Sequence, residues 1–181
     1  MADPVNLDRE LVVGIGAMEV SDDVTVTLST YALGSCLGIV IYDPVARVGG
    51  ILHAMLPTGE LNPTRAESTP AVFVDRGLPA LFRAAYALGA IKSRTVVRIV
   101  GAASRYDGRE TTIGRKNVAM AKKLLWRNSV RIVRSIVGGT DSRTLYLSVE
   151  TGELRVQAVD KQFDTEDFVM TLDQHADGTG T

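Results

Sequence analysis

Short apolar segments rich in β-branched residues dominate the hydrophobic pattern of this chain and predict β-strands. The segment 37–42 is apolar throughout except for one glycine, which is typical of a strand buried on both faces. The turn dipeptide Asp43–Pro44 follows it, so 48–56 is predicted to return as the second strand of a hairpin. The predicted strands are 11–18, 24–28, 37–42, 48–56, 95–100, 130–137, 144–149 and 154–159.

Two other segments place apolar residues at helical spacing. The first starts at Pro70 and ends at Gly89, with a kink or a fresh start expected near Pro79, because proline lacks a backbone N–H. The second is predicted over 113–127, with Thr112 as its N-cap. The connections at 57–69 and 101–111 are predicted to be loops.

Many strands and two main helices predict an α+β fold, a single-domain layered α/β sandwich with mostly antiparallel strands. The chain has 181 residues, 45% of them apolar and 23% charged, which suits one soluble domain. We assign this domain to 11–163, after a flexible N-terminus at 1–10. The segment 164–181 is acidic and lacks Lys and Arg, so it is predicted to be a disordered tail.

Composition narrows the classes of function. No apolar run approaches the ~18 residues needed to cross a bilayer. The first ten residues lack the basic and apolar regions of a secretory signal, so a cytoplasmic location is expected. The single cysteine excludes an internal disulfide and a cysteine-rich metal site. We expect no metal, and a monomer is the default.

The net charge of −1 hides a basic segment between Lys92 and Arg134, which holds twelve Lys and Arg against two Asp and Glu. Such a segment forms either a basic binding face or an ordinary solvated helix surface. Nucleic acid is disfavoured as a partner, because only Tyr106 and Trp126 are available for base stacking in this segment.

Residues with catalytic potential gather at the predicted hairpin. Cys36 is the only cysteine and His53 is one of two histidines, and the 17 positions between them place both near one end of the strand pair. A histidine within hydrogen-bond reach takes the thiol proton and raises the thiolate fraction. Thr30 can orient that histidine, as a carboxylate does in other triads. Gly34 and Ser35 allow a tight turn whose N–H groups can hold an oxyanion.

Each of these residues also has a structural interpretation. An isolated cysteine before an apolar strand is usually a small buried hydrophobe. The combination favours a cysteine enzyme, but the residues alone leave a protease, a transglutaminase and an amidohydrolase open, because all three share an acyl-enzyme step. A non-catalytic docking module is the alternative of a different class.

Three segments closely resemble CheD, the chemoreceptor glutamine deamidase family of bacterial and archaeal chemotaxis. They are 33–36 (Leu-Gly-Ser-Cys), 42–44 (Tyr-Asp-Pro) and 49–57 (Gly-Gly-Ile-Leu-His-Ala-Met-Leu-Pro). The threonine six residues before the cysteine agrees as well. The resemblance spans roughly 10–160 and continues through Phe73–Asp75, Leu88–Ala90, Gly101–Ala102, Ile113–Asn117, Gly138–Gly139, Arg143 and Thr151–Glu153.

The resemblance implies a CheD-like α/β sandwich with a Cys-His-Thr triad. Cys36 would be the nucleophile, His53 the general base and Thr30 the orienting residue. The implied reaction converts a receptor glutamine to glutamate and releases ammonia, which tunes adaptation in chemotaxis. Backbone N–H groups around Gly34, Ser35 and Cys36 would hold the oxyanion. No metal or organic cofactor is implied.

The resemblance also implies partners. The substrate would be the cytoplasmic helices of methyl-accepting chemoreceptors, and some family members bind a CheC-like phosphatase through the deamidase site. Receptor adaptation helices are rich in Glu and Gln, so Arg115, Lys116 and Lys122 are predicted to contribute to partner binding. The alternative within this picture is a non-catalytic module that docks the phosphatase or the receptor.

Several positions depart from the family's usual residues, including Arg98, near which a lysine is common. Val100 stands where a glycine is common, Ile136 begins a pair where an acidic residue is usual, and Ser142 replaces a more usual glycine. None belongs to the predicted triad. These departures are therefore expected to bear on partner docking.

Overall fold

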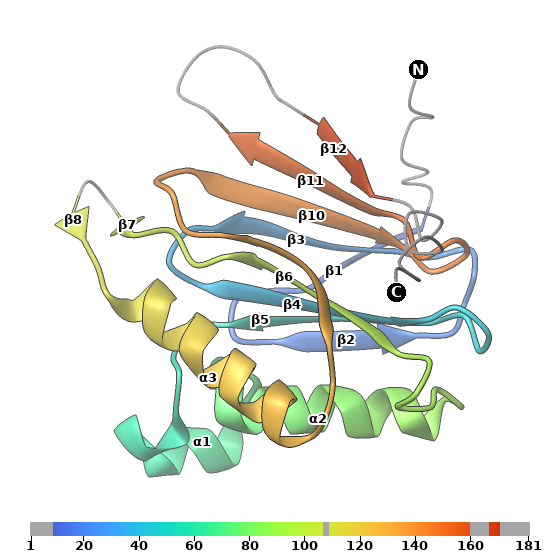
Figure 1. The fold of residues 1–181 in the computed structure, drawn as a ribbon, viewed down its shortest axis with the longest axis horizontal. Helices are drawn as coiled ribbons and strands as arrows, with labels where there is room; N and C mark the ends of the chain where they lie inside the picture. The colour runs from blue at the N-terminus through green and yellow to red at the C-terminus, as the bar shows by residue number, and fades with distance from the viewer. Residues whose placement is uncertain (1–8, 107–108, 160–166, 171–181) are drawn as a thin grey trace, which may run out of the picture.

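Two stacked β-sheets and one layer of helices form the molecule (Figure 1). The structure is a computed structural model that describes residues 9–106, 109–159 and 167–170. Seven of the nine strand pairings are antiparallel, and the parallel ones are β1–β3 and β6–β9. The predicted α+β sandwich with mostly antiparallel strands is confirmed.

One sheet forms the outer layer and contributes the predicted hairpin of β10 and β11. Its strand order is β1-β3-β10-β11-β12. The bounds are β1 Glu10–Val12, β3 Thr27–Leu33, β10 Ser142–Ser148, β11 Leu154–Val159 and β12 Asp167–Met170.

The second sheet lies in the middle, between the outer sheet and the helices. Its strand order is β2-β5-β4-β6-β9. The bounds are β2 Met18–Ser21, β4 Leu37–Asp43, β5 Val48–Ala54, β6 Val96–Gly101 and β9 Ile132–Val137. Every residue of β4 and of β5 is buried, as the continuous apolar run at 37–42 predicts.

Two long helices cover the free face of this middle sheet. They are α2 (Val74–Ala87) and α3 (Ile113–Arg127). Shorter elements are α1 (Pro63–Ser68), the 3-10 turns η1 (Gly59–Leu61) and η2 (Pro70–Val72), and the ribbon β7 (Arg105–Tyr106) with β8 (Arg109–Glu110).

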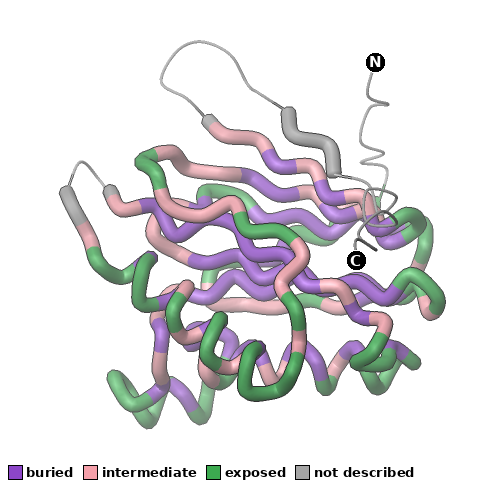
Figure 2. The backbone as a smooth tube through the Cα atoms, in the orientation of Figure 1, coloured by how far each residue is buried: buried purple, intermediate pink, exposed green. Residues whose placement is uncertain are grey.

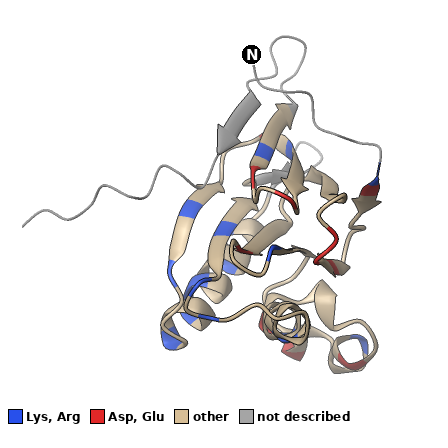
Figure 3. Ribbon diagram, turned by 90° about the vertical axis from the view of Figure 1, so that its right-hand side faces the viewer, with Lys and Arg blue, Asp and Glu red and all other residues tan. Residues whose placement is uncertain are grey.

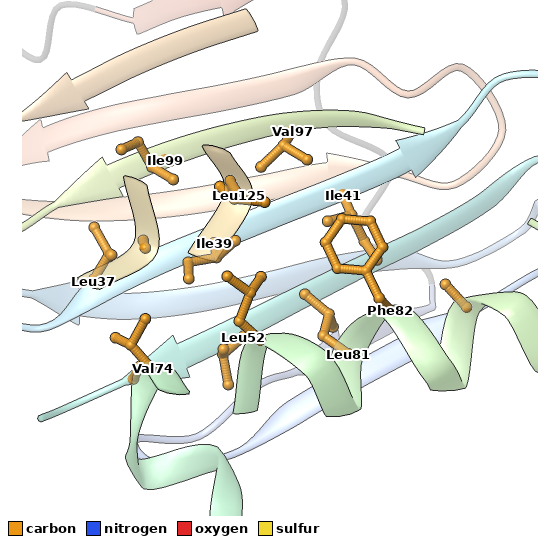
Figure 4. Close-up of a cluster of buried hydrophobic side chains, with 14 of the residues drawn as sticks. Leu37, Ile39, Ile41, Leu52, Val74, Leu81, Phe82, Val97, Ile99 and Leu125 are labelled. Atoms are coloured by element: carbon orange, nitrogen blue, oxygen red, sulfur yellow. The ribbon is translucent and has the colours of Figure 1, made fainter. Parts of the chain in front are cut away.

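The core has two parts, one on each face of the middle sheet. Leu37, Ile39 and Leu52 pack toward the helices, with Leu81 and Leu125 (Figure 4). Residues at alternate positions of the same strands face the outer sheet instead, because side chains alternate along a strand. Figure 2 shows burial along the central strands of both sheets and exposure mainly on the helices and turns. The face between the sheets also carries the buried polar residues Thr30 and His53.

The predicted strand 11–18 is wrong, because two glycines interrupt it. The chain turns at 15–16, where Gly16 takes a φ of 71°, and it passes there from β1 in the outer sheet to β2 in the middle sheet. The strand predicted at 24–28 starts at Thr27 and runs on to Leu33, so it includes Thr30.

Two predictions about the helical region also need correction. The loop expected at 57–69 contains η1 and α1, and Asn62 caps α1 by accepting a hydrogen bond from the N–H of Arg65 at 3.0 Å. Helix α2 runs unbroken through Pro79. An internal proline destabilises a helix by about 3 kcal/mol, whereas burial of the Leu81 and Phe82 side chains stabilises this one by roughly 3–6 kcal/mol. The helix therefore tolerates Pro79.

The predicted ends of the chain are only partly described. Glu10 belongs to β1, and residues 1–8 lie outside the described ranges. Within the segment expected to be a disordered tail, the structure records β12, paired antiparallel with β11. The disordered tail itself stays a prediction. Residues 171–181 lie outside the described ranges.

Candidate active site

A hydrogen bond between the two sheets joins Thr30 to His53. Thr30 lies on β3 of the outer sheet and His53 on β5 of the middle sheet, and both are fully buried. The distance from Thr30 Oγ1 to His53 Nδ1 is 2.7 Å. The contact therefore depends on how the two sheets are stacked.

A second hydrogen bond fixes the protonation of this histidine. Thr30 Oγ1 lies 2.7 Å from the backbone carbonyl of Val13 and donates its only proton to that oxygen. The hydroxyl can then only accept a hydrogen bond from His53, so the imidazole proton sits on Nδ1 and Nε2 carries the lone pair. Within the described residues, the buried Nε2 has no hydrogen-bond partner. His53 is thus arranged as a base with a free acceptor nitrogen.

Cys36 lies on the same face of the middle sheet as this nitrogen. In the pairing of β4 with β5, Gly38 is opposite His53, and Cys36 precedes Gly38 by two positions. Cys36 directly precedes β4, and its packing places it on the face of the middle sheet that is turned toward the outer sheet. Its half-buried side chain packs against the apolar cluster between the sheets.

Burial keeps both groups neutral at rest. It lowers the pKa of His53 to about 4, so the imidazole is uncharged at neutral pH. Burial also raises the pKa of the Cys36 thiol, and the backbone N–H of Cys36 opposes that rise only in part. The resting site therefore holds a thiol and a neutral imidazole rather than a thiolate and an imidazolium.

Carbonyl contacts hold the segment 34–36 between β3 and β4. The carbonyl of Cys36 accepts a hydrogen bond from the N–H of Ala102 at 2.7 Å, and that of Gly34 accepts from Ala103 at 2.8 Å. Within the described part of the chain, the N–H groups of Ser35 and Cys36 have no backbone acceptor. The segment is therefore anchored through its oxygens, while two adjacent donors stay available.

Asn117 of α3 is a site residue that sequence reasoning missed. Its fully buried amide Nδ2 donates to the carbonyls of Ser35 at 3.3 Å and Met55 at 3.1 Å. One side chain thus ties the cysteine segment to the residues that follow His53. A signal existed in the sequence, because position 117 lies one turn before Ala121 on the buried face of the helix, where an amide is unusual. The carbonyl of Val13 left no signal, because it is a backbone group.

The predicted partner-binding residues lie outside this contact network. Arg115, Lys116 and Lys122 are exposed on α3. Of the departures from the family pattern, Val100 is fully buried and Ile136 packs against the cluster between the sheets. These two side chains contribute to the core rather than to a docking surface.

The part of the chain that the structure describes shows neither a metal-binding cluster nor a membrane-spanning helix. Among the residues that the structure describes, no group of three or more His, Cys, Asp or Glu is arranged to hold a metal ion. None of the described helices combines the length and apolar character needed to span a membrane.

Known proteins resemble this chain over most of its length. The family model for CheD chemotactic sensory transduction matches residues 55–158. A protein of Syntrophus aciditrophicus named "Probable chemoreceptor glutamine deamidase CheD 1" is 43% identical over 150 residues, which cover 82% of this chain and 94% of that protein. A protein of Solibacter usitatus named "Probable chemoreceptor glutamine deamidase CheD" is 38% identical, over 85% of this chain and 92% of that protein. A protein of Pyrococcus horikoshii with the same name is 41% identical, over 83% of this chain and 93% of that protein. This chain belongs to the CheD family.

Proposed function

We propose that this chain hydrolyses the side-chain amide of specific chemoreceptor glutamines to glutamate and ammonia, and so tunes adaptation in chemotaxis. The names of its relatives, chemoreceptor glutamine deamidases, support the reaction and the substrate. The family model begins at Met55, two residues after His53, so the assignment of the catalytic residues rests on the geometry of the site.

The observation that carries the proposal is the hydrogen bond between Thr30 and His53. It leaves a lone pair on Nε2, on the face of the sheet that Cys36 shares. We therefore assign Cys36 as the nucleophile, His53 as the general base and Thr30 as the orienting residue.

The first half of the reaction forms a thioester. Nε2 of His53 takes the proton of Cys36 as Sγ attacks the Cδ carbon of the glutamine side chain. The carbonyl oxygen becomes an oxyanion, and we assign the N–H groups of Ser35 and Cys36, which have no backbone acceptor among the described residues, as its donors, with Gly34 allowing the turn. The intermediate collapses as His53 returns the proton to the leaving nitrogen, and ammonia departs.

The second half of the reaction hydrolyses the thioester and regenerates the free enzyme. Nε2 removes a proton from water, whose oxygen attacks the thioester carbon, and the same donors hold the new oxyanion. Collapse breaks the C–S bond, Cys36 regains its proton from His53, and the product is glutamate. No cofactor enters this sequence of steps.

Two alternatives make different predictions. A docking module would have no use for a buried histidine whose tautomer is fixed beside a cysteine. A transglutaminase would form the same thioester but transfer it to an amine, so product mass separates the two reactions.

Exposed cations on α3 are the candidates for partner binding. We assign Arg115, Lys116 and Lys122 to the steering of an acidic receptor surface. Their charge reversal should slow association and weaken its dependence on salt. Unchanged association kinetics would remove the assignment. Binding of a CheC-like phosphatase, the monomeric state and the cytoplasmic location stay predictions.

The intact mass of a glutamine-bearing chemoreceptor cytoplasmic fragment tests the proposal. Incubation with this protein should add about one mass unit for each amide converted to acid, as the exchange of NH2 for OH requires, and peptide mapping should locate each site. The Cys36→Ala variant should add none. A bound receptor whose mass does not change would favour the docking module.

A further inference from the structure

A groove of about 340 Å³ separates the C-terminal halves of α2 and α3. Its floor is apolar and includes Phe82, Tyr86 and Leu124, and its rim carries Arg83 and Lys92. Neither rim cation has an ion-pair partner among the described residues. The groove therefore combines an apolar floor with uncompensated positive charge.

The two chain segments that line the groove contain no Asp or Glu. Residues 76–106 and 111–140 include no Asp or Glu. Asp43 packs against this region from β4, but its carboxylate is bound by Arg94 at 2.9 Å. In Figure 3, Lys and Arg positions gather on the lower left of the ribbon, where red positions are absent. An acidic ligand would therefore meet an excess of positive charge here.

We propose that this groove is a second docking site for the substrate, one that binds an acidic amphipathic helical segment of the receptor away from the reacting glutamine. This inference rests on the proposed function. An apolar side chain of the segment would occupy the floor, and carboxylates on either side of it would pair with Arg83 and Lys92.

Helix α3 connects the groove to the candidate active site. Asn117 contacts the carbonyl of Ser35 at one end, and Asn128 lines the groove at the other. Eleven residues separate them, which is about 16 Å at the rise of an α-helix. A receptor helix lying along α3 would place its docking side chains about three turns from the glutamine. The groove would thus select glutamines at a fixed spacing from an acidic amphipathic segment.

Trp126 adds a candidate anchor beside this path. Its side chain is 80% exposed, although the neighbouring Leu125 is buried in the core. Exposed tryptophans with cations nearby are typical of the residues that dominate protein interfaces. Lys122 lies one turn before Trp126 on the same exposed face of α3.

Steady-state kinetics on the receptor cytoplasmic fragment test the inference. Arg83→Glu and Lys92→Glu should each raise KM about tenfold and leave kcat within about twofold, because they weaken binding without touching the reacting groups. Tyr86→Ala should raise KM without any change of charge. Arg9→Glu is the matched control, an exposed charge reversal beside the outer sheet, and it should leave KM unchanged.

The outcomes separate two failures. A wild-type protein that converts no glutamine would overturn the proposed function, and the docking site with it. If the wild-type protein converts glutamine but the groove variants have the same KM as Arg9→Glu, the docking site alone would be overturned. An altered sedimentation coefficient of the groove variants without receptor would assign the groove to a second copy of this chain. The alkylation rate of Cys36 by iodoacetamide should be equal in all variants, which checks that the site is intact.

Discussion

At the scale of single residues, the candidate site depends on one hydroxyl that makes two hydrogen bonds. Thr30→Val keeps the shape of the side chain but removes both the donor to Val13 and the acceptor for His53. We expect kcat to fall by about 10²-fold, the lower range for acid–base catalysis, because the imidazole loses its fixed tautomer. Thr30→Ser retains the hydroxyl and should restore most of kcat. Equal losses in both variants would indicate a packing role instead.

The pKa of His53 predicts how activity depends on pH. Burial lowers this pKa to about 4, so the base stays neutral well below the ordinary histidine range. The acid limb of kcat/KM should therefore lie near pH 4 rather than near pH 6.5. An acid limb at pH 6–7 in the free enzyme would contradict the neutral resting pair.

The same shift links stability to pH. The unfolded chain binds a proton on His53 below its ordinary pKa of about 6.5, while the native state does not until about pH 4. Stability is thus fully present above pH 6.5 and is lost as pH falls toward 4. Between pH 7.5 and 5, wild type should lose about 2 kcal/mol more than His53→Gln. Urea unfolding of both proteins at the two pH values measures this difference.

Sequence reasoning reached the residue types of the site but not their hydrogen bonds. Cys36, His53 and Thr30 attract notice because a cysteine and a histidine are rare in this chain. The tautomer of His53 depends on the carbonyl of Val13, which lies between the end of β1 and the turn at 15–16, in a segment that the sequence predicted to be one strand. Every residue type has a backbone carbonyl, so the sequence does not reveal which residue will accept such a hydrogen bond.

At the scale of elements, α3 supports the cysteine segment through Asn117. Asn117→Ala would leave the buried carbonyls of Ser35 and Met55 without this donor. The expected loss of unfolding free energy is about 2–3 kcal/mol, with a fall in kcat as the segment loosens. Asn128→Ala at the C-cap of the same helix is a matched control, because the exposed amide of Asn128 donates, among the described residues, only to the carbonyl of Leu124, and its loss should cost about 1 kcal/mol with kcat unchanged. Urea unfolding and kcat for both variants separate local support from helix stability.

Elements with uniform patterns were predictable, and those set by local turns were not. The hairpin of β4 and β5 follows from an apolar run, a turn dipeptide and a second run. The prediction of the N-cap of α3 was less accurate. Thr112 makes no side-chain capping hydrogen bond, and the hydroxyl of Thr111 accepts a hydrogen bond from the N–H of Ile113 instead. The preference for threonine as a capping residue does not distinguish between two adjacent threonines, because the backbone conformation decides which of them accepts the hydrogen bond.

At the scale of the whole molecule, the spacing of the two sheets sets the Thr30–His53 contact. These residues come from different layers, so their 2.7 Å bond holds only while the layers keep their distance. Glycines at the interface permit this approach. A Cβ at Gly38 would lie 2.9 Å from methyl carbons of Leu33 and Leu145 on the outer sheet. Sheet stacking is a long-range property, which is why the strand pattern could not predict it.

Gly38→Ala should therefore affect catalysis more than stability alone explains. The added methyl presses against side chains between the sheets and costs about 1–3 kcal/mol, and separation of the sheets lengthens the contact between Thr30 and His53. Gly50→Ala is the matched control, because its Cβ would meet Leu81 at 3.1 Å on the helical side of the same sheet. At equal loss of unfolding free energy, kcat should fall at least tenfold further for Gly38→Ala, since a lengthened bond no longer fixes the tautomer of His53. Equal kcat in the two variants would mean that catalysis tolerates changes in the spacing of the two sheets.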